Sequence, residues 1–126
     1  MIYGVGADLL RIDRGEGLWR RHGQRAVDKL LHPAERERFD AAANPGHYLA
    51  RSFAAKEAFV KALGTGFRAV GFNEVGIVRQ PEQRPELVFS ERLRAHLDGL
   101  GIRRAHLSFS DEAGMVLAFV VLECDG

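Results

Sequence analysis

Residues 51–66 have the sequence RSFAAKEAFVKALGTG, and the rest of the chain is arranged around this stretch. Alanine, leucine, lysine and glutamate are good helix formers, and no proline interrupts the run. Gly64 stands where a left-handed C-terminal cap is expected. We therefore predict a long helix that begins at about His47, continues to Leu63 and ends at Gly64.

The predicted helix is apolar on nearly every side, which is typical of a buried helix. Lys56, Glu57 and Lys61 nevertheless lie on or beside its large apolar arc, and charges rarely enter a core without a partner. Two interpretations stay open. In the first, Glu57 and Lys61 share a helix face and form an ion pair that reaches the surface. In the second, they belong to a polar site cut into the core, with a carboxylate for a metal and an ammonium for a phosphate.

Composition limits the classes of protein to consider. The 126 residues are enough for one domain, residues 1–126, with a hydrophobic fraction of 46%. The net charge of +1 argues against bulk nucleic-acid binding. The single cysteine, Cys124, cannot form an internal disulfide, which fits a reducing cytosol. No apolar run reaches the length of a membrane span, and no signal peptide is recognisable. We expect a cytoplasmic protein that binds neither nucleic acid nor membrane.

The N-terminal residues carry an acid directly after an apolar run. Ile2 to Ala7 contains Gly4 and Gly6 and predicts a buried strand whose backbone another segment approaches closely. Asp8 follows at once. An acid at the end of a strand is usually a turn residue or a helix cap, so Asp8 becomes a candidate site residue only if Glu57 lies near it.

Five arginines lie within residues 11–25, where the only acids are Asp13 and Glu16. We expect a short helix from Arg14 to Arg25. The arginine-rich segment is interpreted either as a solvated basic face or as a docking surface for an acidic partner. The arginines in question are Arg11, Arg14, Arg20, Arg21 and Arg25.

The remaining pattern predicts an α+β domain with mostly antiparallel strands. One helix begins at His32-Pro33 and ends at a turn formed by residues 44–46. A later helix begins at Ser90 and buries Leu93, Leu97 and Leu100. A hairpin turn is expected at residues 111–114, and the apolar run after it predicts a central strand. The predicted strands cover residues 72–79, 86–89, 104–110 and 115–122.

Two of these segments resemble the motifs of a known enzyme family. Residues 2–9, IYGVGADL, resemble the first motif of the 4′-phosphopantetheinyl transferases, and residues 53–66, FAAKEAFVKALGTG, resemble the second. Chain length, motif spacing and the closing run at residues 120–123 are similar to the short holo-acyl-carrier-protein synthase branch over the whole chain. The resemblance implies the fold of that family, with a long central helix packed on a mostly antiparallel sheet.

The resemblance also implies an activity. Enzymes of this family move the 4′-phosphopantetheine arm of coenzyme A to a serine of an apo acyl carrier protein, in fatty acid or polyketide synthesis. They release adenosine 3′,5′-bisphosphate, require Mg²⁺ and typically form a homotrimer, with each active site between neighbouring subunits. An alternative that stays open is a homologue without transfer activity that acts as a carrier-binding or assembly subunit.

Site residues follow from the same resemblance. Asp8 and Glu57 match the metal carboxylates, and Lys61 matches the lysine that holds the pyrophosphate; these three are the expected catalytic residues. The serine proton would pass to Glu57 either directly or through a water. Gly64, Thr65 and Gly66 would approach the nucleotide end of coenzyme A. The arginine-rich segment, residues 11–25, would dock the acidic carrier protein.

Two positions depart from the family pattern. The family usually has arginine directly before the phenylalanine of its second motif, where this chain has Ser52, and Arg51 lies one position earlier. On a helix, neighbouring residues point about 100° apart. The late strand of the family usually ends in histidine, where this chain has Asp111. Asp111 would either face the nucleotide and repel a phosphate, or start the hairpin turn.

Overall fold

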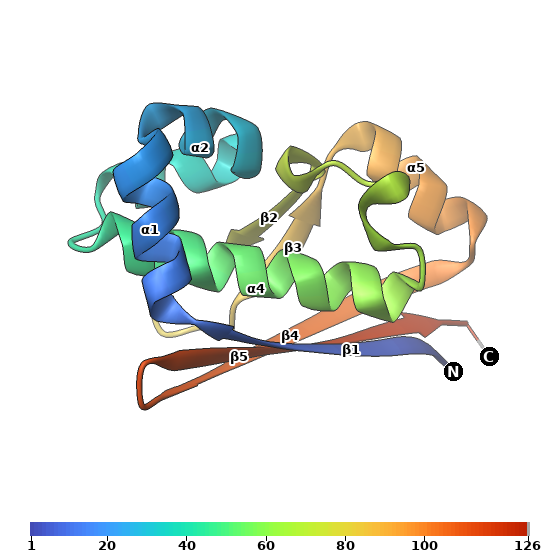
Figure 1. The fold of residues 1–126 in the computed structure, drawn as a ribbon. Helices are drawn as coiled ribbons and strands as arrows, with labels where there is room; N and C mark the ends of the chain where they lie inside the picture. Colours follow the sequence, from blue (N-terminus) through green and yellow to red (C-terminus); the bar gives the residue numbers. More distant parts are fainter. Residues whose placement is uncertain (126) are drawn as a thin grey trace.

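In the computed structural model, which describes residues 1–125, one long helix lies across an antiparallel three-stranded sheet (Figure 1). The helix is α4 (Pro45–Leu63), and the sheet has the strand order β1-β5-β4. β1 spans Ile2–Arg11, β4 spans Ile102–Glu112 and β5 spans Met115–Cys124. The predicted α+β class, the long helix and the central place of the last strand are confirmed.

Local capping sets both ends of α4. The Asn44 side chain accepts a hydrogen bond from the His47 N–H at 3.0 Å, and Pro45 takes the first helical position. The residues predicted as a turn, 44–46, are therefore the start of the helix. At the other end, Gly64 has φ 86° and donates its N–H to the Val60 carbonyl, so the predicted left-handed cap is confirmed.

Strand β1 packs so closely on α4 that two of its residues have no room for a side chain. A Cβ on Gly6 would lie 1.9 Å from the Ala58 carbonyl oxygen, and one on Gly4 would lie 2.0 Å from that of Ala62. The predicted close approach is therefore confirmed. β1 also continues through Asp8 to Arg11, because it pairs with β5 as far as Met115. The prediction that the strand ends before Asp8 is wrong.

Three helices cover the N-terminal half of α4 on the side away from the sheet (Figure 1). Gly23 has φ 51° and divides the predicted arginine-rich helix into α1 (Ile12–His22) and α2 (Gln24–Leu30). The helix predicted from His32 is a short 3₁₀ turn, η1 (Pro33–Glu35), followed by α3 (Arg36–Asp40). These elements enclose a second apolar core, made of Ala26, Val27, Leu31, Phe39 and Leu49.

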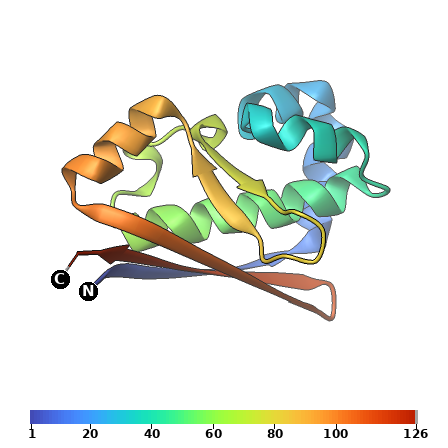
Figure 2. The ribbon, with the colours of Figure 1, turned by 180° about the vertical axis from the view of Figure 1, so that it is seen from behind.

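A small hairpin and one helix complete the fold (Figure 2). The hairpin pairs β2 (Val75–Val78) with β3 (Glu86–Phe89), and α5 (Glu91–Gly99) follows. The strand predicted from residue 72 begins later, because residues 72–74 form a 3₁₀ turn, η3 (Phe72–Glu74). Leu93 and Leu97 are buried as predicted, whereas Leu100 lies just past the end of α5 and is 40% exposed.

The two faces of the large sheet differ. Alternate residues of β5 are fully buried against α4, namely Val116, Ala118, Val120 and Leu122. The opposite face carries a row of exposed apolar side chains, which we call the outer apolar face: Val5, Leu9, Leu117 and Phe119. Across residues 1–125, no helix combines the length and the hydrophobicity that crossing a membrane requires.

The close packing of β1 on α4 predicts a large difference between two glycine substitutions. Gly6→Ala should lower the free energy of unfolding by about 2–3 kcal/mol or more, because the new methyl group meets backbone that cannot move aside. Gly99→Ala, in α5 with open space around it, should instead raise stability by about 0.5–1 kcal/mol. Urea unfolding of both variants measures this, and equal effects would contradict the packing described.

Candidate active site

Asp8 and Lys61 meet at the edge of the sheet. Asp8 lies on the face of β1 that packs on α4, on the same side as Gly4, Gly6 and Leu10. The Lys61 ammonium, on the last turn of α4, donates to Asp8 Oδ1 at 3.1 Å and to the Ala7 carbonyl at 3.1 Å. The Asp8 side chain is 15% exposed and that of Lys61 is 52% exposed, so the pair borders solvent.

Glu57 lies one helical turn before Lys61 and close to Asp8. Partial burial raises the pKa of the Glu57 carboxyl, the negative charge of Asp8 raises it further, and Lys61 and Arg14 oppose these effects. The two carboxylates are therefore near enough to repel each other. Of the two interpretations left open by the sequence, the geometry favours a polar site, since Lys61 forms its ion pair with Asp8.

The donor set of this site suits a hard divalent cation. Within residues 1–125, no cluster of three or more histidine, cysteine, aspartate or glutamate side chains has the geometry to hold a metal. The donors that the site offers are therefore the carboxylates of Asp8 and Glu57. Mg²⁺ commonly takes only one or two protein carboxylates and fills its other positions with water and phosphate oxygens. Asp8 and Glu57 fit that requirement.

The segment after α4 leaves open space beside Lys61. Gly64 and Gly66 both have positive φ, 86° and 63°, and a Cβ at either position would meet nothing within 4 Å. Thr65 donates its hydroxyl to the Gly66 carbonyl at 3.0 Å. This exposed backbone lies one turn beyond Lys61, so a ligand held by Lys61 would have access to it.

Three of the five predicted docking arginines lie beside apolar cavities near Glu57. Arg14 and Arg21 line a cavity of about 210 Å³, and Arg25 lines one of about 350 Å³. Both cavities are bordered by Leu18 of α1 and Phe53 of α4, one turn before Glu57. We call this region the α1–α2 surface. Arg11, paired with Asp13 at 2.7 Å, and Arg20 line neither of these two cavities.

The two departures from the family pattern have specific surroundings. Ser52 is buried and donates its hydroxyl to Glu35 Oε2 at 2.7 Å, and the neighbouring Arg51 guanidinium lies over the Phe109 ring. Asp111 does not start a turn, because β4 continues to Glu112; its Oδ2 lies 3.1 Å from His47 Nε2. His47 is therefore the hydrogen-bonding partner of the carboxylate at position 111.

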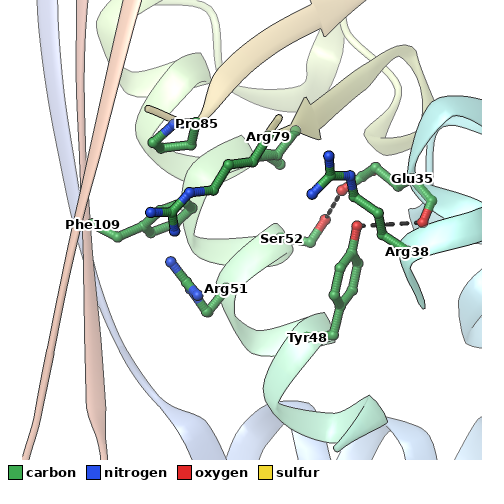
Figure 3. Close-up of a pocket in the computed structure, with 9 residues that line it drawn as sticks. Glu35, Arg38, Tyr48, Arg51, Ser52, Arg79, Pro85 and Phe109 are labelled. Atoms are coloured by element: carbon green, nitrogen blue, oxygen red, sulfur yellow. Dashed lines mark hydrogen bonds between the residues drawn. The ribbon is translucent and has the colours of Figure 1, made fainter. Parts of the chain in front are cut away.

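Sequence reasoning missed an arginine-lined cavity on the other side of α4 (Figure 3). It measures about 130 Å³ and is bordered by Arg38, Arg51 and Arg79, with Tyr48 and Ser52 on its wall. The buried Nε of Arg51 has no hydrogen-bond partner within residues 1–125. The three arginines are far apart in the sequence, on α3, on α4 and after β2, so no local pattern indicates this cavity.

A buried ion pair was also missed. Lys56 Nζ lies 2.8 Å from Glu35 Oε1, and their side chains are 1% and 0% exposed. Burial lowers the pKa of the Lys56 ammonium, and the charge of Glu35 offsets part of that change. The sequence indicated half of this pair, because a lysine among the apolar residues of a buried helix requires a buried partner. The spacing of residues along the chain does not indicate that Glu35, 21 residues earlier, is that partner.

The site geometry agrees with the sequence comparison. Residues 4–113 match the family model described as the 4′-phosphopantetheinyl transferase superfamily. The chain belongs to this superfamily. The holo-acyl-carrier-protein synthase of Thiobacillus denitrificans is 44% identical to it over 124 residues, which are 98% of this chain and 95% of that protein. These matches confirm the family that the two sequence motifs indicated.

Solved structures of phosphopantetheinyl transferases show the same fold. The crystal structure of holo-acyl-carrier-protein synthase from Neisseria meningitidis is 45% identical, with a TM-score of 0.91, covering 98% of this chain and 99% of that one. The Helicobacter pylori enzyme, solved in complex with coenzyme A, is 28% identical with a TM-score of 0.80; the match covers 94% of this chain and 99% of that one. The chain therefore matches these transferases over almost its full length.

The electrostatics of Glu57 predict that this site costs stability. The folded chain raises the pKa of Glu57, so the ionised carboxylate is disfavoured in the folded state at neutral pH. Glu57→Gln should therefore stabilise the protein at pH 7 in the presence of a chelator, by about 0.2–1 kcal/mol for a partly buried group that solvent still screens. The gain should vanish below pH about 4, where the carboxyl is protonated in both the folded and the unfolded state.

Thermal unfolding at a series of pH values measures this effect. The matched control is Glu37→Gln. Glu37 is an exposed residue of α3, 20 residues before Glu57 in the sequence, and its substitution should change stability little at any pH in the series. A Glu57→Gln variant less stable than the parent at pH 7 would contradict the account of the site.

Proposed function

We propose that this protein transfers the 4′-phosphopantetheine arm of coenzyme A to a serine of an apo acyl carrier protein and releases adenosine 3′,5′-bisphosphate. The observation that supports this proposal best is the meeting of Asp8, Glu57 and Lys61 at one edge of the sheet. These residues belong to separate segments of the chain, and two carboxylates beside an ammonium are what a pyrophosphate substrate with a divalent cation requires. The relatives with up to 45% identity are named for this reaction.

Asp8 and Glu57 hold Mg²⁺ in this proposal, and Lys61 binds the pyrophosphate of coenzyme A. When bound, the cation neutralises phosphate charge and aligns the pyrophosphate for attack. Lys61 releases Asp8 in part and turns its ammonium toward the departing phosphate, whose charge it stabilises. Glu57 receives the serine proton, directly or through a water. Gly64 to Gly66 supply backbone for the nucleotide end.

The α1–α2 surface is the proposed docking site for the carrier protein. Its exposed arginines, Arg14, Arg21 and Arg25, suit an acidic partner, and its apolar cavities suit an apolar side chain at the centre of the contact. Because both cavities border Phe53, a carrier bound there has its serine close to Glu57. Arg11 and Arg20 would act at the margin, by attracting the carrier at longer range.

We also propose a homotrimer, on the evidence of the outer apolar face and of the sheet topology. Asp8 lies on β1, at one edge of the sheet, and β4 forms the other edge. In a cyclic assembly, the outer apolar faces of neighbouring subunits meet and β1 of each subunit approaches β4 of the next. Each Asp8 group then lies beside a neighbouring chain.

The transfer reaction is tested by mass spectrometry of several apo carrier proteins after incubation with coenzyme A and Mg²⁺. The wild-type protein should add one phosphopantetheine to at least one carrier and should stop when the cation is chelated. Asp8→Asn, Glu57→Gln and Lys61→Met should each lower kcat by at least about 100-fold, the scale of losing one group that stabilises transition-state charge.

Controls separate this reaction from the binding-subunit alternative. Glu37→Gln should keep full activity, and a known transferase should modify the same carriers. If the control enzyme modifies the carriers and this protein modifies none of them, the transferase proposal fails. Calorimetry showing carrier binding without metal-dependent coenzyme A binding would then favour the non-catalytic subunit.

The trimer is tested by substitution on the outer apolar face. The wild-type protein should have a mass of about 42 kDa by light scattering, three times the 14.0 kDa chain. Phe119→Asp places a charge on that face and should give monomers. Leu100→Asp is the matched control, because Leu100 is 40% exposed, similar to the 43% of Phe119, but lies at the end of α5. Loss of the trimer in both variants, or in neither, would contradict the proposed interface.

A further inference from the structure

The ion pair of Lys56 and Glu35 lies between the two apolar cores of the molecule. On one side is the core between α4 and the large sheet, and on the other is the smaller core under α1, α2 and α3. The side chains are 1% and 0% exposed, and neither belongs to the proposed reaction. A buried ion pair is a poor source of stability, because an apolar pair of similar volume is usually as stable or more so. Its geometry therefore calls for another explanation.

Lys56 joins three separate segments. Its ammonium donates to Glu35 Oε1, in η1, and to the main-chain carbonyl of Leu30, the last residue of α2. Glu35 is fully occupied as well: its carboxylate also accepts from the His32 N–H at 3.0 Å and from the Ser52 hydroxyl at 2.7 Å. The end of α2 is thus hydrogen-bonded to α4. These bonds are directional and fix its position, whereas apolar packing is non-directional and would allow α2 to shift along α4.

The two ends of this connection are both parts of the proposed active site. α2 carries Arg25, which with Lys29 and Leu30 lines the 350 Å³ cavity of the α1–α2 surface. Lys56 directly precedes Glu57 in α4. The ammonium therefore links the α2 part of the proposed docking surface to the helix turn that carries the metal carboxylate.

We infer that Lys56, held by Glu35, is a positioning residue that sets the distance and orientation of the α2 docking arginine relative to the carboxylates of the active site. The inference rests on the proposed function, because it names what orients the carrier protein at that same site. α1 does not need this connection, since Gly15 packs directly on Gly46 and Ala50 of α4. Of the two helices of the α1–α2 surface, only α2 is bonded to Lys56, so the effect on carrier docking should be confined to contacts made by α2.

The test removes both charges together. Lys56→Met alone would leave the Glu35 carboxylate unpaired in the core and would endanger folding. The paired variant E35Q/K56M keeps the side-chain volumes and leaves an amide oxygen at position 35 to accept from the His32 N–H. It should fold with a single thermal transition. Its KM for the carrier protein should rise about tenfold, while kcat and the KM for coenzyme A stay within about twofold. The reason is that the variant displaces the α2 contacts with the carrier protein and leaves the contacts with coenzyme A in place.

Coupling to Arg25 separates positioning from a general loss of stability. In the wild-type background, Arg25→Gln should weaken carrier binding, measured by calorimetry with the apo carrier. In E35Q/K56M the same substitution should have little further effect, because Arg25 is already out of place. An equal effect in both backgrounds, or a parallel rise of both KM values, would overturn the inference.

Ser52→Ala is the matched control. It removes a hydrogen bond to the same Glu35 carboxylate from the same helix, but Ser52 has no bond to Leu30. It should lower the melting temperature and leave the KM for the carrier unchanged. If E35Q/K56M does not fold, E35Q/K56Q, whose shorter amide cannot reach both Leu30 and position 35, is judged by the same two criteria. Wild-type transfer in the same assay shows the proposed function independently of this outcome.

Discussion

The contact between β1 and α4 brings the candidate site together. Gly4 and Gly6 allow the strand to lie directly on the helix backbone, with no side chain between them and the carbonyls of Ala62 and Ala58. Because side chains alternate along a strand, the same register points Asp8 toward α4. Helix periodicity then places Glu57 and Lys61 on the turns that face it. A bulkier residue in the strand would push it away from the helix and move these groups apart.

The charges of this molecule serve two different purposes according to their depth. Asp8, Glu57 and Lys61 lie at the rim, where solvent screens the repulsion between the carboxylates and leaves room for a ligand. Lys56 and Glu35 lie in the interior, where every oxygen of the carboxylate has a donor. Two lysines five residues apart on one helix therefore have opposite surroundings, the first structural and the second open to a substrate. The active rim is less stable than it could be, which is a common cost of function.

Sequence reasoning succeeded where one local pattern dominated. The run of helix formers before Gly64 predicted α4 and its cap, and Gly4 and Gly6 predicted the close approach to β1. It failed at element ends: β1 continues past Asp8 because β5 pairs with it, and α1 ends at Gly23 because that residue takes a positive φ. It also failed at Leu100, where apolar periodicity continued past the end of α5. In each case a partner strand or a single backbone conformation overrode the local pattern.

The sequence by itself determined the long helix, the α+β class and the two motifs whose residues form the site, because these depend on periodicity, capping and residue types at short range. Only the tertiary structure decided which charges meet. Lys61 pairs with Asp8, Lys56 with Glu35 and His47 with Asp111, and the partners lie between 21 and 64 residues apart. Pairing over such separations follows from how helix and sheet pack, since spacing along the chain does not record which faces come into contact.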